Sequence, residues 1–372
     1  MEIIEAMFGA IYKNKKVLIT GNTGFKGSWL SIWLLKLGAE VYGVSKDIPT
    51  KPSMFKELGL ETKITHNEKD VRDLTSTKQI VEEVKPDLLF HLAAQSLVSL
   101  SYSNPIETIT SNVMGTTNVL EALKVSNPKC IGIIITSDKC YDNVEWVWGY
   151  KETDTLGGKD IYSGSKGAAE LIFKSYYHSF FKKPNSNVKA VTTRAGNVIA
   201  GGDWALDRIV PDCIRSWSKS EAVEIRSPNA TRPWQHVLEP LSGYLTLGHQ
   251  LLEGKELNGE SFNFGPLSQY NHTVKEFVQD LSKYWNFQDP SKAYKITDAI
   301  KFQEAGLLKL NCDKALFDLK WLPTLSYEKL IEFTGSWYFN FYKGKINMLD
   351  FTLSQIDEYE QTASNKKIQW TA

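Results

Sequence analysis

Short apolar runs alternate with longer stretches of mixed polarity along the first 200 residues of the chain. The runs are rich in β-branched residues and lie at residues 17–20, 41–44, 87–91, 131–136 and 190–194. Apolar runs of this length are typical of strands that are buried on both faces, and helical connections between them place such strands parallel. The pattern predicts an α/β fold, namely a doubly wound parallel sheet of the Rossmann type that is covered by helices.

The pattern loosens after Gly201 and Gly202, where loops separate shorter elements. A strand is expected near residues 223–226, and helices are expected at 274–285, 313–321 and 327–342. We therefore expect a sheet domain over 13–200, to which about 232–262 return, and a smaller mixed domain over 201–231 and 263–350. Residues 351–372 are expected to form a C-terminal tail that frays after Ser364.

The charge balance excludes several classes of partner. The 372 residues include 43 Lys and Arg against 43 Asp and Glu, and this net charge of zero argues against a nucleic-acid partner. No apolar run approaches the roughly 18 residues of a membrane span. Glu2 and Glu5 lie where a signal peptide would be basic. We therefore expect a cytoplasmic protein with no membrane partner.

The four cysteines are Cys130, Cys140, Cys213 and Cys312, and they are scattered without CxxC or Cys/His clustering. Such spacing favours buried thiols over a disulfide framework or a zinc site. We expect no structural metal.

Three glycines follow the first predicted strand and open a helix expected over residues 24–36. Gly21, Gly24 and Gly27 have GxxGxxG spacing. Glycine allows a tight turn and lets backbone amides approach a pyrophosphate, which the positive end of the helix then stabilises. The spacing predicts a dinucleotide-binding loop and excludes a P-loop, because no GK[ST] follows. The other loop residues expected to contact the cofactor are Thr23, Phe25 and Lys26.

The end of the second strand bears on which dinucleotide binds. An acid that holds the adenosine ribose is usual about 20 residues beyond the glycines. Ser45 occupies that position, Asp47 lies two residues later, and Lys46 could instead favour the 2′-phosphate of NADP. NAD is the expected cofactor, because no arginine directly follows this strand. Asp70 and Val71 follow a third predicted strand and are candidates for contact with adenine, although Asp70 could equally be a solvated turn residue.

Tyr162 and Lys166 are four residues apart and therefore share one face of a helix. A lysine beside a phenol lowers the pKa of the phenol, so Tyr162 could take a proton from a sugar hydroxyl near neutral pH. This spacing alone is weak, since solvent-facing pairs are common. Here it occurs together with polar or alanine-rich strand ends, where a doubly wound sheet opens its ligand crevice. Those strand ends carry Ala93, Ala94 and Gln95, and Ser137, Asp138 and Lys139.

These motifs resemble those of the extended short-chain dehydrogenase/reductases and, within that family, the CDP-glucose 4,6-dehydratases. The resemblance covers most of the chain from Lys16 to about Leu245. Its segments are TGNTGFKGSWL (20–30), HLAAQ (91–95), TSDKCYDN (136–143), YSGSK (162–166), RAGNVIAGGDW (194–204) and TRPWQHVLEPLSGYL (231–245). The Asp138–Lys139 pair and the GGDW and RPWQHV blocks point to the CDP-glucose branch, because dTDP-glucose dehydratases usually carry an Asp-Glu pair there.

The resemblance implies a lyase that converts CDP-D-glucose to CDP-4-dehydro-6-deoxy-D-glucose and water with tightly held NAD, in deoxysugar and cell-surface polysaccharide biosynthesis. Tyr162 would deprotonate the C4 hydroxyl, Lys166 would lower the pKa of Tyr162 and bind the nicotinamide ribose, and Ser137 would hold the C4 oxygen. Asp138 would protonate the departing C6 hydroxyl. Lys139 would either take the C5 proton as a base or stabilise the enolate as a cation.

The resemblance also implies how the substrate is held. Asn197, Arg208 and Arg232 match the usual carriers of the diphosphate, and His236 could join them. A homo-oligomer, either a dimer or a tetramer, is expected. Structural roles are expected for His91 and Arg194, and Cys140 and Tyr141 are expected either to pack in the core or to line the pocket.

Two other functions remain open from the sequence. A nucleotide-sugar epimerase or reductase on the same fold would use Tyr162 and Lys166 but would have no task for Asp138 and Lys139. A non-catalytic dinucleotide-binding protein is a second alternative, since fold does not fix function. The joint presence of Ser137, Tyr162 and Lys166 argues against it.

Overall fold

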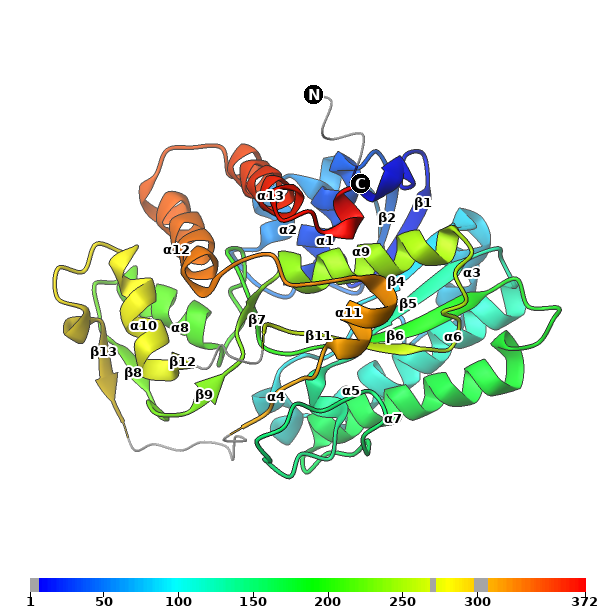
Figure 1. Ribbon diagram of the computed structural model, residues 1–372, viewed down its shortest axis with the longest axis horizontal. Helices are drawn as coiled ribbons and strands as arrows, with labels where there is room; N and C mark the ends of the chain where they lie inside the picture. The colour runs from blue at the N-terminus through cyan, green and yellow to red at the C-terminus, as the bar shows by residue number, and fades with distance from the viewer. Residues whose placement is uncertain (1–6, 268–271, 298–306) are drawn as a thin grey trace.

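A parallel sheet forms the centre of the molecule. The computed structural model describes residues 7–267, 272–297 and 307–372, so Glu2 and Glu5 lie outside the described residues. Seven strands of this part of the chain form one sheet in the order β11-β6-β5-β4-β1-β2-β3 (Figure 1). They are β1 (Lys16–Thr20), β2 (Glu40–Ser45), β3 (Thr65–Glu68), β4 (Leu88–His91), β5 (Ile131–Ile135), β6 (Lys189–Ala195) and β11 (Ser261–Phe264). All neighbouring pairs are parallel, and the order reverses between β1 and β4, which confirms the doubly wound fold.

Successive residues of each strand point to opposite faces and so enter two separate apolar cores. Val17 and Ile19 of β1 pack on one side of the sheet, and Leu18 packs on the other. The first side is covered by α1 (Phe25–Lys36) and α9 (Leu238–Leu252), and the second by α3 (Leu74–Val84), α6 (Gly115–Ser126) and α7 (Ile161–Tyr176) (Figure 1). The carboxyl ends of the strands therefore meet at one edge of a sheet that is covered on both faces.

The chain leaves the sheet after β6, builds smaller elements beside it, and returns with α9 and β11. Three two-stranded pairs occur in the described ranges: β8 with β13, β9 with β12, and β7 with β10. The strands are β7 (Val198–Ile199), β8 (Val223–Ile225), β9 (Thr231–Arg232), β10 (Gln235–His236), β12 (His272–Thr273) and β13 (Tyr294–Ile296). The further helices are α2 (Met54–Glu57), α4 (Val98–Ser103), α5 (Pro105–Ile109), α8 (Ile209–Trp217), α10 (Val274–Lys283), α11 (Asp313–Leu319) and α12 (Tyr327–Lys343).

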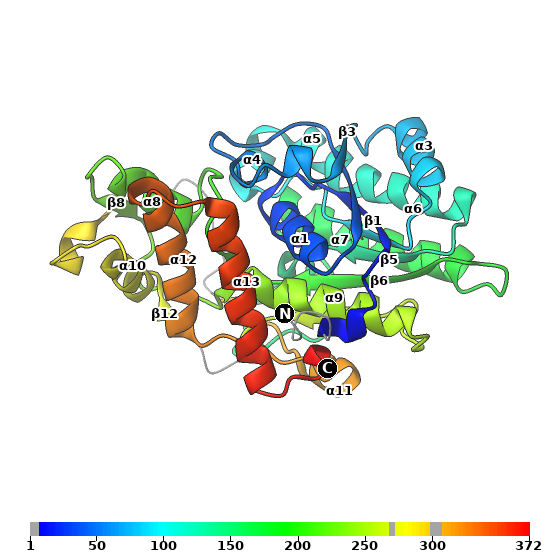
Figure 2. The same ribbon diagram turned by 90° about the horizontal axis from the view of Figure 1, so that it is seen from above.

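The C-terminal residues form a packed helix and not the tail expected over 351–372. Helix α13 (Met348–Asn365) runs beside α1 (Figure 2), and its Ile356 and Tyr359 are buried. Beyond the helix, Trp370 is also buried and stacks on Phe8, with ring centroids 5.0 Å apart. The expected fraying is wrong because the polar composition hid an apolar stripe with helical spacing, which large aromatic side chains anchor.

All four cysteines are free thiols, and Cys130, Cys140 and Cys213 are buried. Within the described residues, no group of three or more His, Cys, Asp or Glu side chains is placed to hold a metal ion. None of the described helices combines the length and the apolarity needed to cross a bilayer.

Candidate active site

The glycine loop joins β1 to α1 in a conformation that needs glycine. Gly21 has a φ of +80°, and a Cβ atom there would lie 2.7 Å from the amide nitrogen of Ala93. A Cβ atom on Gly27 would lie 2.1 Å from the carbonyl oxygen of Gly21. Helix α1 begins after Gly24, which provides no side-chain cap, so the N–H groups of its first turn remain available to an anion. The loop therefore fits a dinucleotide pyrophosphate.

Ser45 is hydrogen-bonded to the glycine loop. Its side chain is buried, its Oγ donates to Oδ1 of Asn22 at 2.9 Å, and it accepts the Thr23 amide at 3.3 Å. The next residue, Lys46, is bound to Glu107, with Nζ 2.8 Å from Oε1. The hydroxyl of Ser45 is thus engaged with the loop itself, and contact with an adenosine ribose stays a prediction.

Asp70 is held by a residue that the sequence did not single out. Nε and Nη2 of Arg72 donate to its carboxylate at 2.8 and 2.6 Å, and the Arg72 amide donates at 2.9 Å. Burial opposes ionisation of Asp70, but these bonds lower its pKa overall. Val71 is buried under α6, where its methyl group lies 3.0 Å from the position of a Cβ on Gly115. Asp70 is therefore a partly exposed turn residue that is ion-paired to Arg72, and its contact with adenine stays a prediction.

The segment after β4 is tied to α7, the helix that carries Tyr162 and Lys166. The Gln95 amide donates to Oδ1 of Asn112 at 2.8 Å, and Nδ2 of Asn112 donates to Oγ of Ser165 at 2.9 Å. Ala93 lies against Gly21, and Ala94 follows it at the same edge. Asn112 thus links the predicted cofactor-contacting segment to α7. Because its partners are far away in the sequence, spacing could not identify it.

Two buried polar residues have the structural roles expected of them. His91 lies between Oγ1 of Thr20 at 2.7 Å and Oγ1 of Thr116 at 3.0 Å, and burial lowers its pKa to about 3. Nη2 of Arg194 lies 2.8 Å from Oε2 of Glu170, and neither side chain is exposed. Both predictions are confirmed.

Ser137, Asp138 and Lys139 follow β5 at the open edge of the sheet. Oγ of Ser137 donates to Oδ1 of Asp138 at 2.9 Å, and Nζ of Lys139 lies 3.2 Å from the same oxygen. Asp138 is buried. Although burial opposes its charge, Lys139 has a raised pKa because Asp138 and Tyr162 favour the ammonium form. The resting state of the pair is an ion pair.

Tyr162 and Lys166 lie in the first turns of α7, directly beside this pair. Nζ of Lys166 is 6.0 Å from the centroid of the Tyr162 ring. Burial raises the pKa of Tyr162, and the groups that oppose this rise are Lys139, Ser137 and Arg208. Burial also lowers the pKa of Lys166 to about 8. Lys139 and Arg208 are thus cations that favour the phenolate, and the expected effect of Lys166 on the pKa of Tyr162 stays a prediction.

Two of the predicted diphosphate carriers face the same cluster. Arg208 donates to Oδ2 of Asp203 at 2.7 Å and to Oγ of Ser96 at 3.0 Å. Its positive charge lowers the pKa of Tyr162. Arg232 lies close enough to Lys139 to oppose its charge. Asn197 stands at the start of β7, where its carbonyl accepts the amide of Gln235 at 3.0 Å.

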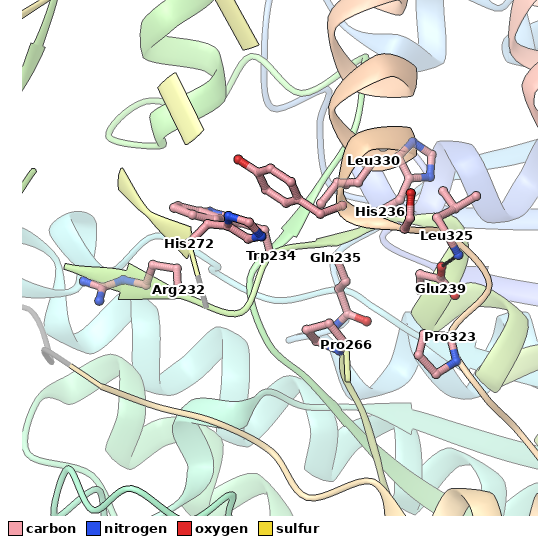
Figure 3. Close-up of a pocket in the computed structure, with 12 residues that line it drawn as sticks. Arg232, Trp234, Gln235, His236, Glu239, Pro266, His272, Pro323, Leu325 and Leu330 are labelled. Carbon is pink, nitrogen blue, oxygen red and sulfur yellow. Dashed lines mark hydrogen bonds between the residues drawn. The ribbon is translucent and has the colours of Figure 1, made fainter. Parts of the chain in front are cut away.

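His236 does not join these cations. Figure 3 shows a pocket between β9, β10 and the start of α12, with Arg232 at one end and His236 on the far side among apolar residues. The ring of His236 is buried edge-on to Trp29 and Phe333, and its Nδ1 accepts the Leu238 amide at 3.3 Å. Burial lowers its pKa to about 3, so it carries no charge for a diphosphate. The expectation for His236 is wrong because the sequence does not show which side of a two-residue strand faces the core.

The sequence also matches a known protein family. The sequence matches the model described as GDP-mannose 4,6 dehydratase over residues 18–334, which is most of the chain. The chain belongs to the GDP-mannose 4,6 dehydratase family. It is 43% identical over 352 residues to a CDP-glucose 4,6-dehydratase of Salmonella typhimurium, covering 94% of this chain and 97% of that protein.

Members of this family share their fold with solved structures of lower sequence identity. A dTDP-glucose 4,6-dehydratase from Bacillus anthracis in complex with NAD has a TM-score of 0.72 at 18% identity, covering 87% of this chain and 96% of that one. A UDP-glucose 4-epimerase from Thermotoga maritima with UDP-glucose has a TM-score of 0.74 at 22% identity, covering 87% and 98%. These likenesses concern the fold. The family match itself spans every site residue placed above, whereas α13 lies beyond it.

Proposed function

We propose that the chain is a CDP-glucose 4,6-dehydratase, which converts CDP-D-glucose to CDP-4-dehydro-6-deoxy-D-glucose and water. The observation that carries this proposal is the Asp138–Lys139 pair at the end of β5, directly beside Tyr162. An oxidation at C4 needs only one group that accepts a proton. An elimination needs a second acid–base pair, and this site contains one.

NAD is the proposed cofactor. The glycine loop and the uncapped start of α1 fit a pyrophosphate, and NAD would supply a hydride acceptor for C4 and a hydride donor for C6. At the end of β2, Lys46 is already bound to Glu107 at 2.8 Å and lies 3.8 Å from Asp47. Two carboxylates at that point disfavour the 2′-phosphate that would distinguish NADP.

Tyr162 would take the proton of the C4 hydroxyl, while Ser137 would donate a hydrogen bond to the C4 oxygen. The phenol is buried, which raises its pKa and makes the phenolate costly. Lys139 and Arg208 oppose that cost, so proton removal would depend on cations from two different elements. Lys166 lies under the ring and would bind the nicotinamide ribose.

Asp138 and Lys139 would carry out the elimination together. Transfer of one proton from Nζ of Lys139 to Oδ1 of Asp138, 3.2 Å away, turns the ion pair into a carboxylic acid and a neutral amine. The amine would take the proton from C5, which the 4-ketone acidifies, and the acid would protonate the leaving C6 hydroxyl. The ion pair is then restored, and water is released without any other proton donor.

Arg208, Arg232 and Asn197 would hold the diphosphate of the substrate. Guanidinium groups match phosphate oxygens in two-pronged geometry, and Arg208 is pre-oriented by Asp203 and Ser96. These residues come from the segment that leaves the sheet after β6, so the substrate would lie between the sheet edge and the smaller elements.

The decisive experiment is the double variant Asp138→Asn/Lys139→Met, given CDP-D-glucose. Elimination should stall. Oxidation at C4 should be slower, because Lys139 no longer favours the phenolate of Tyr162, but Arg208 remains, so absorbance near 340 nm from reduced nicotinamide should rise slowly and persist. The parental protein should instead release 4-keto-6-deoxy sugar, which is detected by its absorbance in alkali. Release of that product by the double variant at the parental rate would refute the elimination roles and favour an epimerase or reductase. Absence of any oxidation by the parental protein would favour a non-catalytic dinucleotide-binding protein.

The chain also carries an apolar surface suited to a second copy of itself. Ile106 of α5, Met114 of the adjoining π-helical turn (Thr110–Met114) and Leu171 of α7 are 71%, 47% and 54% exposed on elements that pack together. Large exposed apolar side chains on elements that pack together are typical of subunit interfaces. We expect a dimer or tetramer by light scattering, and a monomer for Leu171→Arg.

A further inference from the structure

Lys26 lies in the first turn of α1, on a side of the helix that can be assigned from its neighbours. Residues three apart share a helix face, so Lys26 lies on the same side as Trp29. The indole N–H of Trp29 donates to the carbonyl of Gly201 at 3.0 Å. This side of α1 therefore faces Gly201, at the start of the segment that leads to Arg208.

The charges around Lys26 belong to the predicted catalytic and substrate-binding residues. The pKa of its ammonium group is lowered by the charges of Arg208, Lys166 and Lys139 and raised by that of Asp138. Of these, Asp138 is bound to Lys139 at 3.2 Å, and Arg208 has its own carboxylate partner. In the part of the chain that the structure describes, no carboxylate lies within ion-pair distance of Lys26.

An ammonium group left among other cations is unfavourable unless an anion joins them. Burial and the cations Arg208, Lys166 and Lys139 lower the pKa of Lys26 to about 7. The cluster thus has an excess of positive charge on the substrate side of the glycine loop. The backbone N–H groups of that loop are available to the predicted pyrophosphate of the cofactor, whereas the Lys26 ammonium group lies among the charges of Arg208, Lys166, Asp138 and Lys139.

We propose that Lys26 positions the substrate by binding, together with Arg208, the diphosphate of the nucleotide sugar. This inference rests on the proposed function. It changes the role predicted from the sequence, in which Lys26 contacts only the cofactor. The side chain of one loop residue would then hold the substrate while the backbone of the same loop holds NAD.

The test compares binding of a nucleoside diphosphate with binding of its nucleoside. Calorimetry on the NAD-loaded protein would measure CDP and cytidine, with UDP, GDP, dTDP and their nucleosides as a panel. Lys26→Met should weaken CDP binding about 10- to 100-fold, the size expected for loss of one charged hydrogen bond, and leave cytidine binding unchanged. Lys26→Arg should restore CDP binding to within a few fold, and KM for the sugar nucleotide should rise more than kcat falls.

Lys275→Met is the matched control, because Lys275 is also the second residue of its helix, α10, but is exposed. It should bind CDP like the parental protein. Loss of NAD from Lys26→Met with intact CDP affinity after NAD is added back would overturn the inference in favour of a cofactor role. If Lys26→Met binds CDP and NAD as the parental protein does, the inference is overturned in favour of a structural role for Lys26. If the parental protein prefers another nucleoside diphosphate, the CDP assignment alone is refuted, and the effect of Lys26→Met is then measured with that ligand. If the parental protein binds no nucleoside diphosphate, both the proposed function and the role of Lys26 are refuted.

Discussion

Glu170 and Arg194 form a fully buried ion pair that joins α7, the helix that carries Tyr162, to β6. Nε and Nη2 of Arg194 donate to the two carboxylate oxygens at 2.9 and 2.8 Å, and hydroxyls of Thr136 and Thr192 donate to the same carboxylate. Glu170→Gln removes the negative charge with little change of shape. Arg194, which has no exposed side-chain surface, is then left as a buried cation without a counter-charge.

The expected cost follows from that burial. Removing one partner of a buried pair typically destabilises a protein by about 3–5 kcal/mol. With a urea dependence of roughly 3 kcal/mol per molar, the unfolding midpoint should fall by about 1–2 M. Turnover should fall as well, because α7 holds Tyr162 against Lys139.

Urea unfolding followed by tryptophan fluorescence measures this loss. Glu121→Gln is the control: it breaks a 2.8 Å ion pair to Lys124 on the neighbouring helix α6, where the pair is partly exposed, and should cost at most about 1 kcal/mol. Glu170→Leu combined with Arg194→Met should be more stable than Glu170→Gln, because no unpaired charge remains. A midpoint for Glu170→Gln equal to that of Glu121→Gln would refute the reasoning.

Two further predictions concern chemistry and pH. Tyr162→Phe should lower turnover by about 100- to 10,000-fold while NAD content and circular dichroism stay parental, and near-parental turnover would remove Tyr162 from the mechanism. Burial raises the pKa of Glu239 to about 7, against the opposing N–H groups of Leu325 and Thr324. The folded chain thus holds a proton that the unfolded chain releases near its ordinary pKa, so this group's contribution to stability should fall as pH rises from about 4.5 to 7 and level off above. Glu239→Gln should remove this fall, and parallel stability–pH curves for the two proteins would contradict the assignment.

Local patterns in the sequence were sufficient to predict the sheet and the residues of the candidate active site. The strands were found because β1, β4 and β5 are short apolar runs, and the loop because Gly21 and Gly27 are required by backbone contacts that no larger residue allows. Lys139 was placed at a strand end that the parallel topology brings to one edge, and Tyr162 on a helix beside that edge.

Contacts between residues far apart in the sequence, and the direction in which a side chain points, could not be predicted from local patterns. Asn112 gained its role only through the distant chain segments that it contacts. The partner of Arg72 is only two residues away, but the sequence does not show that the side chain turns back to Asp70. His236 points into the core from a strand too short to show a period. The apolar stripe of α13 was hidden by its polar average, although Ile356 and Tyr359 have helical spacing.

The contact between the two ends of the fold bears on how the chain is made. Phe8 stacks on Trp370, and Lys36 of α1 is ion-paired to Glu360 of α13. During synthesis the early residues leave the ribosome first, and their partners follow after more than 300 further residues. The side of α1 that carries Trp33 must therefore stay uncovered until α13 and Trp370 have been synthesised, so this helix is a place where a nascent chain would need a chaperone.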